Sequence, residues 1–391
     1  MSLRNSRATA VVLVTLATFA DIVAYSICVP VLPDFARRLG ASPAQIGLMF
    51  ASFGVTLLAV SVPMGAVSDR TGRKLPLVIG MLTLAGSTMM FARADSLTSL
   101  FLARMIQGAA DGVTWVVGFA LIADCYGPED RGRVMGYVMS GTSFGIMVGP
   151  SIGGWLYEAG GVALPFEFLS ALSLVCAAGF AFLDPQLRGD RPGRLSIWSV
   201  VRVPSVALCT VAIVLTGSTI AMLEPVLPLF FDRHLGLTPA QIGLLFGAAA
   251  VASTLMPLIY GPVIHHWGAP RLTLIGLMLT AAWLPMMATA SSFGTALALI
   301  VVQWIAIALI ITPSLTYMAE VTAFAGGDAF GIGYGIYNTA WGFGLLGGPA
   351  LGGWLFDHVG FAALATGWAI VTIAAVAALA GLRSFGPWRV T

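Results

Sequence analysis

The sequence predicts an all-α polytopic membrane protein with twelve transmembrane helices, arranged as two six-helix bundles. Three observations support this prediction. The composition is too apolar for a surface in water, the apolar runs are long enough to cross a bilayer, and the first half of the chain reappears in the second. No alternation of polar and apolar residues favours a barrel, so the spans must be helices that satisfy their own backbone groups in lipid.

The composition excludes an ordinary soluble domain. Of the 391 residues, 58% are hydrophobic and only 9% are charged, whereas charged residues make up about 25% of a typical soluble domain. Runs such as LPLVIGMLTLAGSTMMF fit the roughly 20 apolar residues that cross a bilayer as a helix. Twelve spans are expected, near residues 9–32, 45–67, 75–93, 97–123, 133–157, 163–183, 205–230, 240–263, 271–290, 294–320, 330–356 and 360–382.

The distribution of basic residues predicts the orientation of these spans. With the N-terminus inside, fourteen of the 19 Lys and Arg residues fall in cytoplasmic segments and four in external ones, and Arg104 lies within a span. The excess of positive charge on one side places both termini in the cytoplasm. The N-terminal stretch MSLRNSRATAVVLV runs directly into the first span, so no cleavable signal peptide is expected.

The four cysteines are expected to fill apolar space. They lie in or at the ends of different spans and show no CxxC spacing, which argues against disulfides and metal binding. These residues are Cys28, Cys125, Cys176 and Cys209.

The chain contains an internal duplication. PVLPDFARRLGASPAQIGLMF, from Pro30, returns as PVLPLFFDRHLGLTPAQIGLLF from Pro225, and GIMVGPSIGGWLY from Gly145 returns as GLLGGPALGGWLF from Gly344. We expect an N-terminal bundle at 1–184, a cytoplasmic linker at 185–204 and a C-terminal bundle at 205–391. Parallel repeats of this kind are typical of transporters whose substrate site lies between the halves and whose access alternates.

Several motifs resemble those of a known family. GAVSDRTGRK (65–74) resembles the signature between spans 2 and 3 of the major facilitator superfamily. ARMIQG (103–108) and GIMVGPSIGG (145–154) resemble motifs of its proton-coupled drug antiporters with twelve spans. AMLEPVLP in span 7, the aspartate nine residues before PVLP in span 1, and RGRVMGYVMSG look like the vesicular monoamine transporters. The resemblance runs from about residue 15 to residue 360 and implies a prokaryotic-type relative of those amine/proton antiporters.

The resemblance implies gating roles for two stretches. Gly65 is expected to let span 2 approach span 11, while Asp69, Arg70 and Arg73 form a cytoplasmic ion network that latches the halves in one state. Anchoring of the topology by positive charge is the alternative. The second copy has His265 and His266 in place of the acid and base, so a latch is not expected there. The GPxxGG stretch of span 5 is expected to seal and bend a helix contact, through Gly145, Gly149, Pro150, Gly153 and Gly154.

Ionisable residues within the spans are the candidates for substrate and proton binding, because a charge at a helix centre costs roughly 2.5–3.5 kcal/mol. Asp21 lies midway along span 1. Arg104 and Asp111 are seven residues apart on one face of span 4, where a direct pairing of the two is expected. Glu224 precedes a proline in span 7. Since spans 1, 4, 7 and 10 line the cavity in this superfamily, the resemblance implies a pocket of net charge −2 that attracts cations.

Aromatic side chains that can bind an ammonium group by cation–π attraction surround these residues in the expected spans. Packing alone is the alternative for each of them, and Asn338 is a polar candidate in the same region. The aromatic candidates are Phe50, Phe53, Phe230, Tyr317, Tyr334, Tyr337 and Trp341.

This sequence also departs from the vesicular transporters. They have a lysine where this chain has Phe53, an aspartate where it has Asn338, and a further aspartate where it has Ala308. A charged pair of the family is therefore neutral here. Proton coupling would then depend on Asp21, Glu224 and Asp111.

The sequence favours a proton-coupled antiporter that exports organic cations, either monoamines or amphipathic cationic drugs. An exporter of neutral or zwitterionic metabolites with the same fold is the alternative, against which the negative pocket argues. No nucleophile–base set, metal spacing or phosphate loop indicates an enzyme. We expect a multi-pass monomer in the cell membrane that binds a small organic cation and protons but no nucleic acid, with no cofactor besides the coupling proton. The physiological substrate and the proton stoichiometry do not follow from the sequence.

Overall fold

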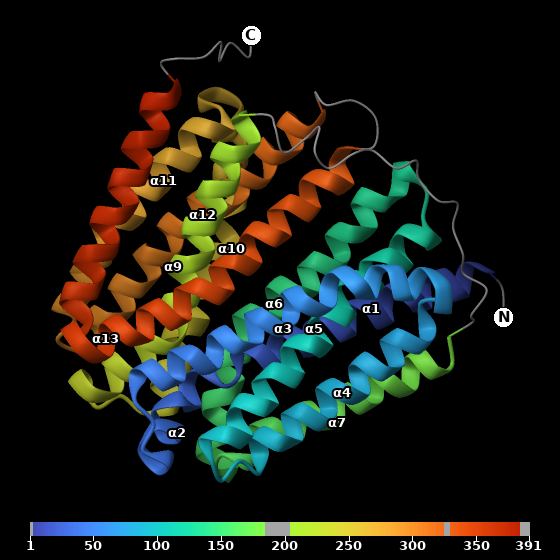
Figure 1. The fold of residues 1–391 in the computed structure, drawn as a ribbon, viewed down its shortest axis with the longest axis horizontal. Helices are drawn as coiled ribbons and strands as arrows, with labels where there is room; N and C mark the ends of the chain where they lie inside the picture. Colours follow the sequence, from blue (N-terminus) through green and yellow to red (C-terminus); the bar gives the residue numbers. More distant parts are fainter. Residues whose placement is uncertain (1–2, 184–203, 324–328, 384–391) are drawn as a thin grey trace. The chain divides into compact units, whose positions relative to one another are not determined.

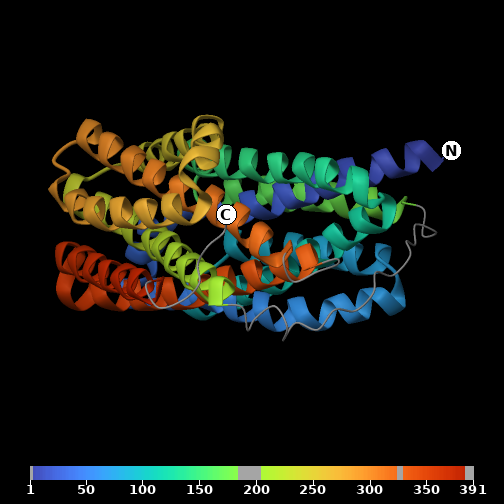
Figure 2. The same cartoon turned by 90° about the horizontal axis from the view of Figure 1, so that it is seen from above.

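The computed structural model describes residues 3–183, 204–323 and 329–383. Every regular element in these ranges is a helix, as Figures 1 and 2 show. The predicted linker at 185–204 falls almost wholly outside the described residues.

The first half of the chain contains seven α-helices and one 3-10 helix. Apolar residues dominate each long helix, and their ends coincide with prolines, glycines or capping side chains. For example, the Ser42 hydroxyl accepts a hydrogen bond from the N–H of Gln45, whose side chain in turn accepts one from the Ser42 N–H. The helices are α1 (Leu3–Ser26), η1 (Val29–Val31), α2 (Leu32–Leu39), α3 (Pro43–Thr71), α4 (Lys74–Ala92), α5 (Leu97–Cys125), α6 (Pro128–Gly160) and α7 (Ala163–Ala181).

The second half contains five α-helices and one 3-10 helix among the described residues. Its last helix, α13, covers the two final predicted spans and bends at Gly360, whose φ of 77° and ψ of 173° are not helical. Figure 1 shows the two arms of α13 meeting at this bend. The helices are α9 (Pro204–Leu235), α10 (Pro239–Trp267), α11 (Ala269–Trp283), η2 (Leu284–Thr289), α12 (Phe293–Ala323) and α13 (Ala329–Arg383).

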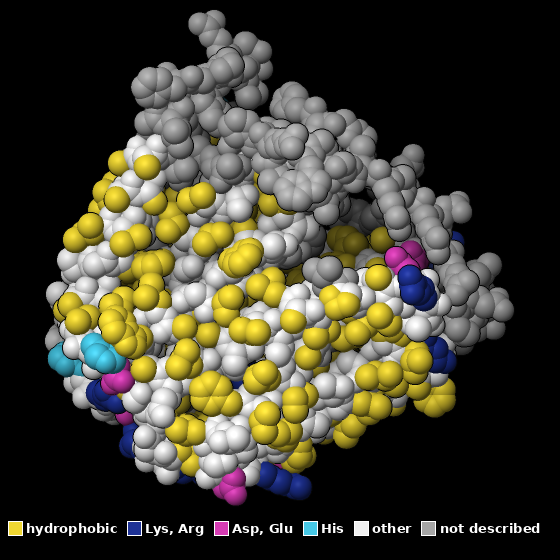
Figure 3. Space-filling view, viewed as in Figure 1, with side chains coloured by type: hydrophobic (Ala, Val, Ile, Leu, Met, Phe, Trp, Pro, Cys, Tyr) yellow, Lys and Arg dark blue, Asp and Glu magenta, His cyan; other side chains and the backbone are white. Residues whose placement is uncertain are grey.

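Each of the twelve predicted spans coincides with helix. Ten described segments are long and apolar enough to cross a membrane. The one over residues 335–378 covers most of the last two predicted spans, and the Gly- and Ser-rich α6 is not among the ten. In Figure 3 hydrophobic side chains spread across the middle of the visible face, while most charged ones gather towards its lower and right edges. This distribution suits a belt in contact with lipid.

The duplication extends to the turns. Six glycines in the described chain have a positive φ, and they form three pairs at the offset of the sequence repeat: Gly40 with Gly236, Gly72 with Gly268, and Gly161 with Gly360. Each pair ends a helix or joins two of them in corresponding places. The two halves therefore share their chain reversals, for which a residue without Cβ is favoured.

Residue contacts divide the chain into two compact units. Unit 1 contains residues 1–191 and 227–247, and unit 2 contains residues 192–226 and 248–391. Helices α9 and α10 thus each contribute to both units. The predicted bundle limits at 184 and 205 stay a prediction.

Glycines of α6 form a stripe that packs against α1 within unit 1. A Cβ atom at Gly145 would collide with Ile22, one at Gly149 with Ser26, and one at Gly153 with the backbone of Ile27. In unit 2, Gly344, Gly348 and Gly352 of α13 lie in the same way against α9, at Gly217, Ser218 and Met222. Small residues thus bring two helices close in both copies of the GPxxGG stretch.

A second face of α6 packs against the start of α10, also within unit 1. A Cβ at Gly154 would overlap the carbonyl of Pro239, and one at Gly243 would overlap that of Pro150. The Ser151 hydroxyl donates to the Gly243 carbonyl over 3.2 Å. Nearby, Arg37 of α2 forms an ion pair with Asp232 at the end of α9.

We predict that Gly153→Val lowers the thermal unfolding midpoint of the purified protein. The added side chain meets the backbone of Ile27, so the cost is that of overpacking, about 1–3 kcal/mol. Gly136→Val is the matched control on the same helix, because nothing lies within 4 Å of its Cβ position. Equal midpoints for the two variants would contradict the packing described here.

Candidate functional site

Asp21 lies near the middle of the apolar segment Arg7–Leu39 and is 1% exposed. Its partners come from α5, which runs antiparallel to α1. The indole Nε1 of Trp115 donates a hydrogen bond to Asp21 Oδ2 over 3.0 Å. The Asp111 carboxyl group lies within hydrogen-bonding reach of the Asp21 carboxyl group. Asp111 and Trp115 are four residues apart, so the helix repeat places both on the face that meets α1.

The expected direct pairing of Arg104 with Asp111 is wrong. No ion pair joins the two in the described chain; instead Arg104 Nη1 donates to Gln107 Oε1 over 2.5 Å, and Nη2 donates to the Tyr25 carbonyl over 3.4 Å and to Cys28 Sγ over 3.2 Å. Seven helical residues separate Arg104 and Asp111 by about 10 Å along the axis. The guanidinium therefore reaches the end of α1 rather than Asp111.

Arg104 and Gln107 act as a cap for α1. The helix ends at Ser26, ahead of Pro30 and Pro33, so carbonyl groups in its last turn lack backbone partners. Gln107 Nε2 donates to the Ala24 carbonyl over 3.1 Å, next to the Arg104 bond to Tyr25. A cation at this position also complements the negative end of the helix dipole.

Aromatic rings enclose the Arg104 guanidinium, which is fully buried. Phe50 and Phe53 were predicted as ammonium ligands, and in this structure the cation against them is Arg104. Because their rings are 1% and 3% exposed, they offer little surface to another molecule here. The ring centroids within reach of Arg104 Cζ are those of Phe50 at 4.2 Å, Tyr25 at 4.8 Å, Phe53 at 5.3 Å and Phe91 at 5.8 Å.

The candidates of the second half lie on α9, α12 and α13. Glu224 is half-buried on α9 in unit 2, and Asn338 is exposed on α13. Phe230, at the unit 1 end of α9, stacks on His234 with 5.2 Å between centroids. Tyr317, Tyr337 and Trp341 belong to one apolar cluster with residues of α9, which matches their alternative reading as packing residues. The side chain of Tyr334 lies outside the described residues.

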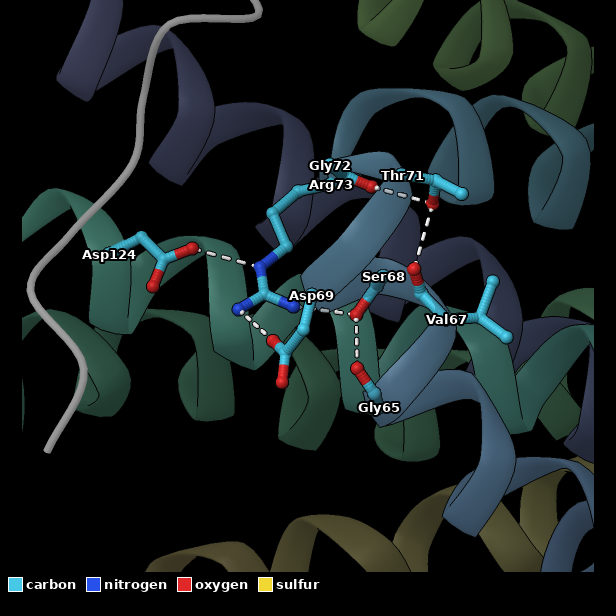
Figure 4. A network of polar contacts seen from close by, with 8 residues as sticks. All are labelled: Gly65, Val67, Ser68, Asp69, Thr71, Gly72, Arg73 and Asp124. Atoms are coloured by element: carbon cyan, nitrogen blue, oxygen red, sulfur yellow. Dashed lines mark hydrogen bonds and ion pairs between the residues drawn. The ribbon is translucent and has the colours of Figure 1, made fainter. Parts of the chain in front are cut away.

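Arg73 is the centre of a polar network at the α3–α4 turn (Figure 4). Its guanidinium forms ion pairs of 2.8 Å with Asp69 and with Asp124 of α5, and donates to the Ser68 hydroxyl over 2.6 Å. Burial opposes ionisation of Arg73, but its hydrogen bonds to Asp124 and Asp69 outweigh this, so its pKa is raised. The predicted network therefore exists within the first half, with Asp124 as a member that the motif does not contain.

One detail of the predicted latch needs correction. Arg70 is exposed and takes part in no ion pair within the described chain, so it is not a member of the network around Arg73. Gly65 faces Val116 of α5, 3.7 Å from its Cβ position, and its predicted role in the approach of span 2 to span 11 stays a prediction. The close neighbour of α3 at this level is α5.

The described residues contain no group of three or more His, Cys, Asp or Glu side chains that could hold a metal ion. All four cysteines are buried thiols. Cys28 is more than apolar filler, because its sulfur accepts the hydrogen bond from Arg104.

Comparison with known proteins identifies the family. The sequence profile described as Major Facilitator Superfamily matches residues 14–230 and, a second time, residues 209–389. The chain belongs to this superfamily. The relatives of this chain in the superfamily are transporters rather than enzymes. The chain is accordingly a multi-pass membrane transporter.

Individual relatives agree with this assignment. The mouse MFS-type transporter SLC18B1 is 27% identical over 387 residues, with 92% of this chain and 83% of that protein covered. The human synaptic vesicular amine transporter is 28% identical over 337 residues, with 85% and 66% covered. These matches confirm the resemblance to vesicular amine transporters.

A solved structure confirms the fold. A bacterial homologue of the human lysosomal transporter Spinster, in an inward-facing and occupied conformation, superposes with a TM-score of 0.79 at 15% identity, and 96% of this chain and 95% of that chain are covered.

We predict that Arg104→Lys destabilises the protein by about 1–3 kcal/mol, the cost of leaving buried acceptors unsatisfied. A lysine ammonium cannot match the fork of donors or the stacking of a guanidinium. Unfolding midpoints in detergent measure the effect. Arg93→Lys, at an exposed helix end, is the control and should stay within about 0.5 kcal/mol. A wild-type midpoint for Arg104→Lys would refute the capping role.

Loss of the Arg73 network should also lower stability. Arg73→Ala leaves two carboxylates and a hydroxyl without their common donor, at a cost of about 1–3 kcal/mol. The neighbouring Arg70→Ala removes the same charge without these contacts and should change stability by about 0.5 kcal/mol or less. Unfolding midpoints of both variants at low and high salt decide the matter, since equal losses would mean that only net charge counts.

Proposed function

We propose that this protein exports organic cations, either monoamines or amphipathic cationic drugs, in exchange for protons. It alternates access across the cell membrane, with twelve spans and both termini in the cytoplasm. The observation that supports this best is the buried Asp21 of α1, which has a second carboxyl group, Asp111, beside it and no basic side chain paired with it in the described chain.

A carboxyl group at membrane depth suits the exchange of two cations. It costs several kcal/mol to hold there as an unpaired ion, so a positive partner is required. A proton and an organic ammonium group both meet this need, and they exclude each other at one carboxylate. The name of the human relative, a synaptic vesicular amine transporter, agrees with an amine as the second cation.

Glu224 is a further carboxylate to which we assign a role, and it belongs to the second half of the chain. It precedes Pro225 on α9, and a proline frees the carbonyl four residues before it. We assign Glu224 a role shared in turn by proton and substrate. Binding of an amine should then release protons and tighten as the pH rises.

Transport in proteoliposomes tests the function. With an acidic lumen and a neutral exterior, we expect a labelled, permanently charged organic cation to accumulate inside, because protons leave in exchange. A fixed charge prevents passive trapping of a neutral base, and protein-free liposomes give the background. Accumulation that is the same with and without the pH gradient would overturn proton coupling. Uptake of neutral or zwitterionic solutes but of no cation in a wider panel would overturn the substrate class.

Two variants test whether Asp21 and Glu224 are the residues that bind the cation and the proton. Asp21→Asn should lose gradient-driven cation uptake while it stays folded and inserted, and Glu224→Gln should lose accumulation together with the pH dependence of amine binding. Asp95→Asn, an exposed residue of the α4–α5 turn, should transport like the wild type. Calorimetry in two buffers of different ionisation enthalpy counts the protons released on amine binding. Equal counts for the wild type and Glu224→Gln would make Glu224 structural only.

A further inference from the structure

The contact between Asp21 and Asp111 has a chemical requirement of its own. Both residues are buried, at 1% and 7% exposure, and their carboxyl groups lie within hydrogen-bonding reach of each other. Asp21 Oδ2 accepts a hydrogen bond from Trp115, whereas Asp21 Oδ1 is buried without a donor in the part of the chain that the structure describes. An ionised carboxylate only accepts hydrogen bonds. The two groups can therefore bond to each other only when one of them holds a proton.

Among the described residues, no basic side chain forms an ion pair with Asp21 or Asp111. Helix α1 packs against α4, α5, α6 and α7. Of their charged groups, Arg104 acts on Asp111 from a distance, without an ion pair. The remaining acidic and basic residues of these helices all lie within six residues of a helix end: Arg4, Arg7, Lys74, Asp124, Glu129, Asp130, Arg131, Arg133, Glu158 and Glu167.

We propose that Asp21 and Asp111 form a dyad that holds one proton between them when the site is empty, and that a substrate cation replaces this proton. The proposal rests on the proposed exchange of protons for organic cations and names the residues that hold the proton. Two carboxylates with one proton have a charge of −1. Two ionised carboxylates with one bound monocation also have a charge of −1. The exchange at this site is thus one proton for one positive charge, and the bare charge of −2 is avoided in the membrane.

Trp115 is the positioning residue of the dyad. Its indole N–H donates to Oδ2 of Asp21, while Oδ1 of Asp21 has no hydrogen-bond donor among the described residues. An indole nitrogen donates but does not accept, so Trp115 keeps the carboxyl group oriented without competing for the proton. The i, i+4 spacing on α5 fixes Trp115 and Asp111 relative to each other.

Infrared spectroscopy of the purified full-length protein tests the dyad without any substrate. The carbonyl stretch of a protonated carboxyl group is separate from the carboxylate bands, so a pH titration follows its loss. The wild type should lose the dyad signal in two steps, separated by about one pH unit or more, because interacting carboxyl groups titrate as a pair. Asp21→Asn and Asp111→Asn should each show one step at a new pH.

Further variants serve as controls. Asp95→Asn changes an exposed carboxyl group and should leave both steps in place. Trp115→Phe should move the upper step to higher pH, since the ionised Asp21 loses its donor, whereas a purely structural role would leave the titration unchanged. Asparagine is nearly isosteric with aspartate; if one Asn variant fails to fold, as judged by circular dichroism, the other gives the same test. A remaining aspartate that titrates as in the wild type would overturn the dyad.

The outcomes separate this inference from the proposed function. Proteoliposomes that exchange protons for a charged cation, together with independent titration of Asp21 and Asp111, would leave the function intact and overturn the dyad. Paired titration in a protein that shows no proton-driven cation transport would support the dyad and overturn the proposed function.

Discussion

The contact between α1 and α5 is the interaction on which the first half of the molecule depends. A polar group buried within a membrane cannot form hydrogen bonds with water. Here the carbonyl groups at the end of α1 and the Asp21 carboxyl group form hydrogen bonds with side chains of one neighbouring helix. Gln107 and Arg104 bind the carbonyls where α1 ends, and Trp115 and Asp111 meet Asp21 one turn further in. The capping bonds and the Trp115–Asp21 bond thus lie along a single antiparallel interface, which leaves Asp21 Oδ1 and Arg104 Nε without a hydrogen-bond partner among the described residues.

The duplication supplies the scaffold, and individual substitutions supply the chemistry. Paired turn glycines and paired glycine stripes give both halves the same helix reversals and the same close approach of α6 to α1 and of α13 to α9. The polar residues do not repeat in this way. Met222 occupies on α9 the place that Ile27 occupies opposite α6, while the acids Asp21 and Glu224 fall at different points of their halves. Close helix packing constrains the paired glycines, whereas the polar residues of the two halves differ in position and in contacts.

The sequence was sufficient for the helices but not for the partners of their polar residues. Hydropathy and the repeat located the spans, because a lipid environment permits little besides apolar helices, and the cost of burial marked Asp21. The partner of Arg104 could not be predicted, since it depends on where α1 ends and on which way a long side chain turns. Asp124 is likewise 51 residues from Arg73 and has no spacing signal. The position of Trp115 could have been predicted, because it lies four residues after Asp111 and therefore on the same face of α5.

The α1–α5 interface also sets an order of events during synthesis. Helix α1 leaves the ribosome first, yet its polar partners on α5 are encoded 79 to 94 residues later. Until α5 is inserted, the end of α1 lacks its cap and Asp21 must remain neutral or stay near the headgroups. The first span is therefore completed only when the fourth arrives, and a chain truncated before α5 would present to the insertion machinery a helix with an acid that nothing yet shields.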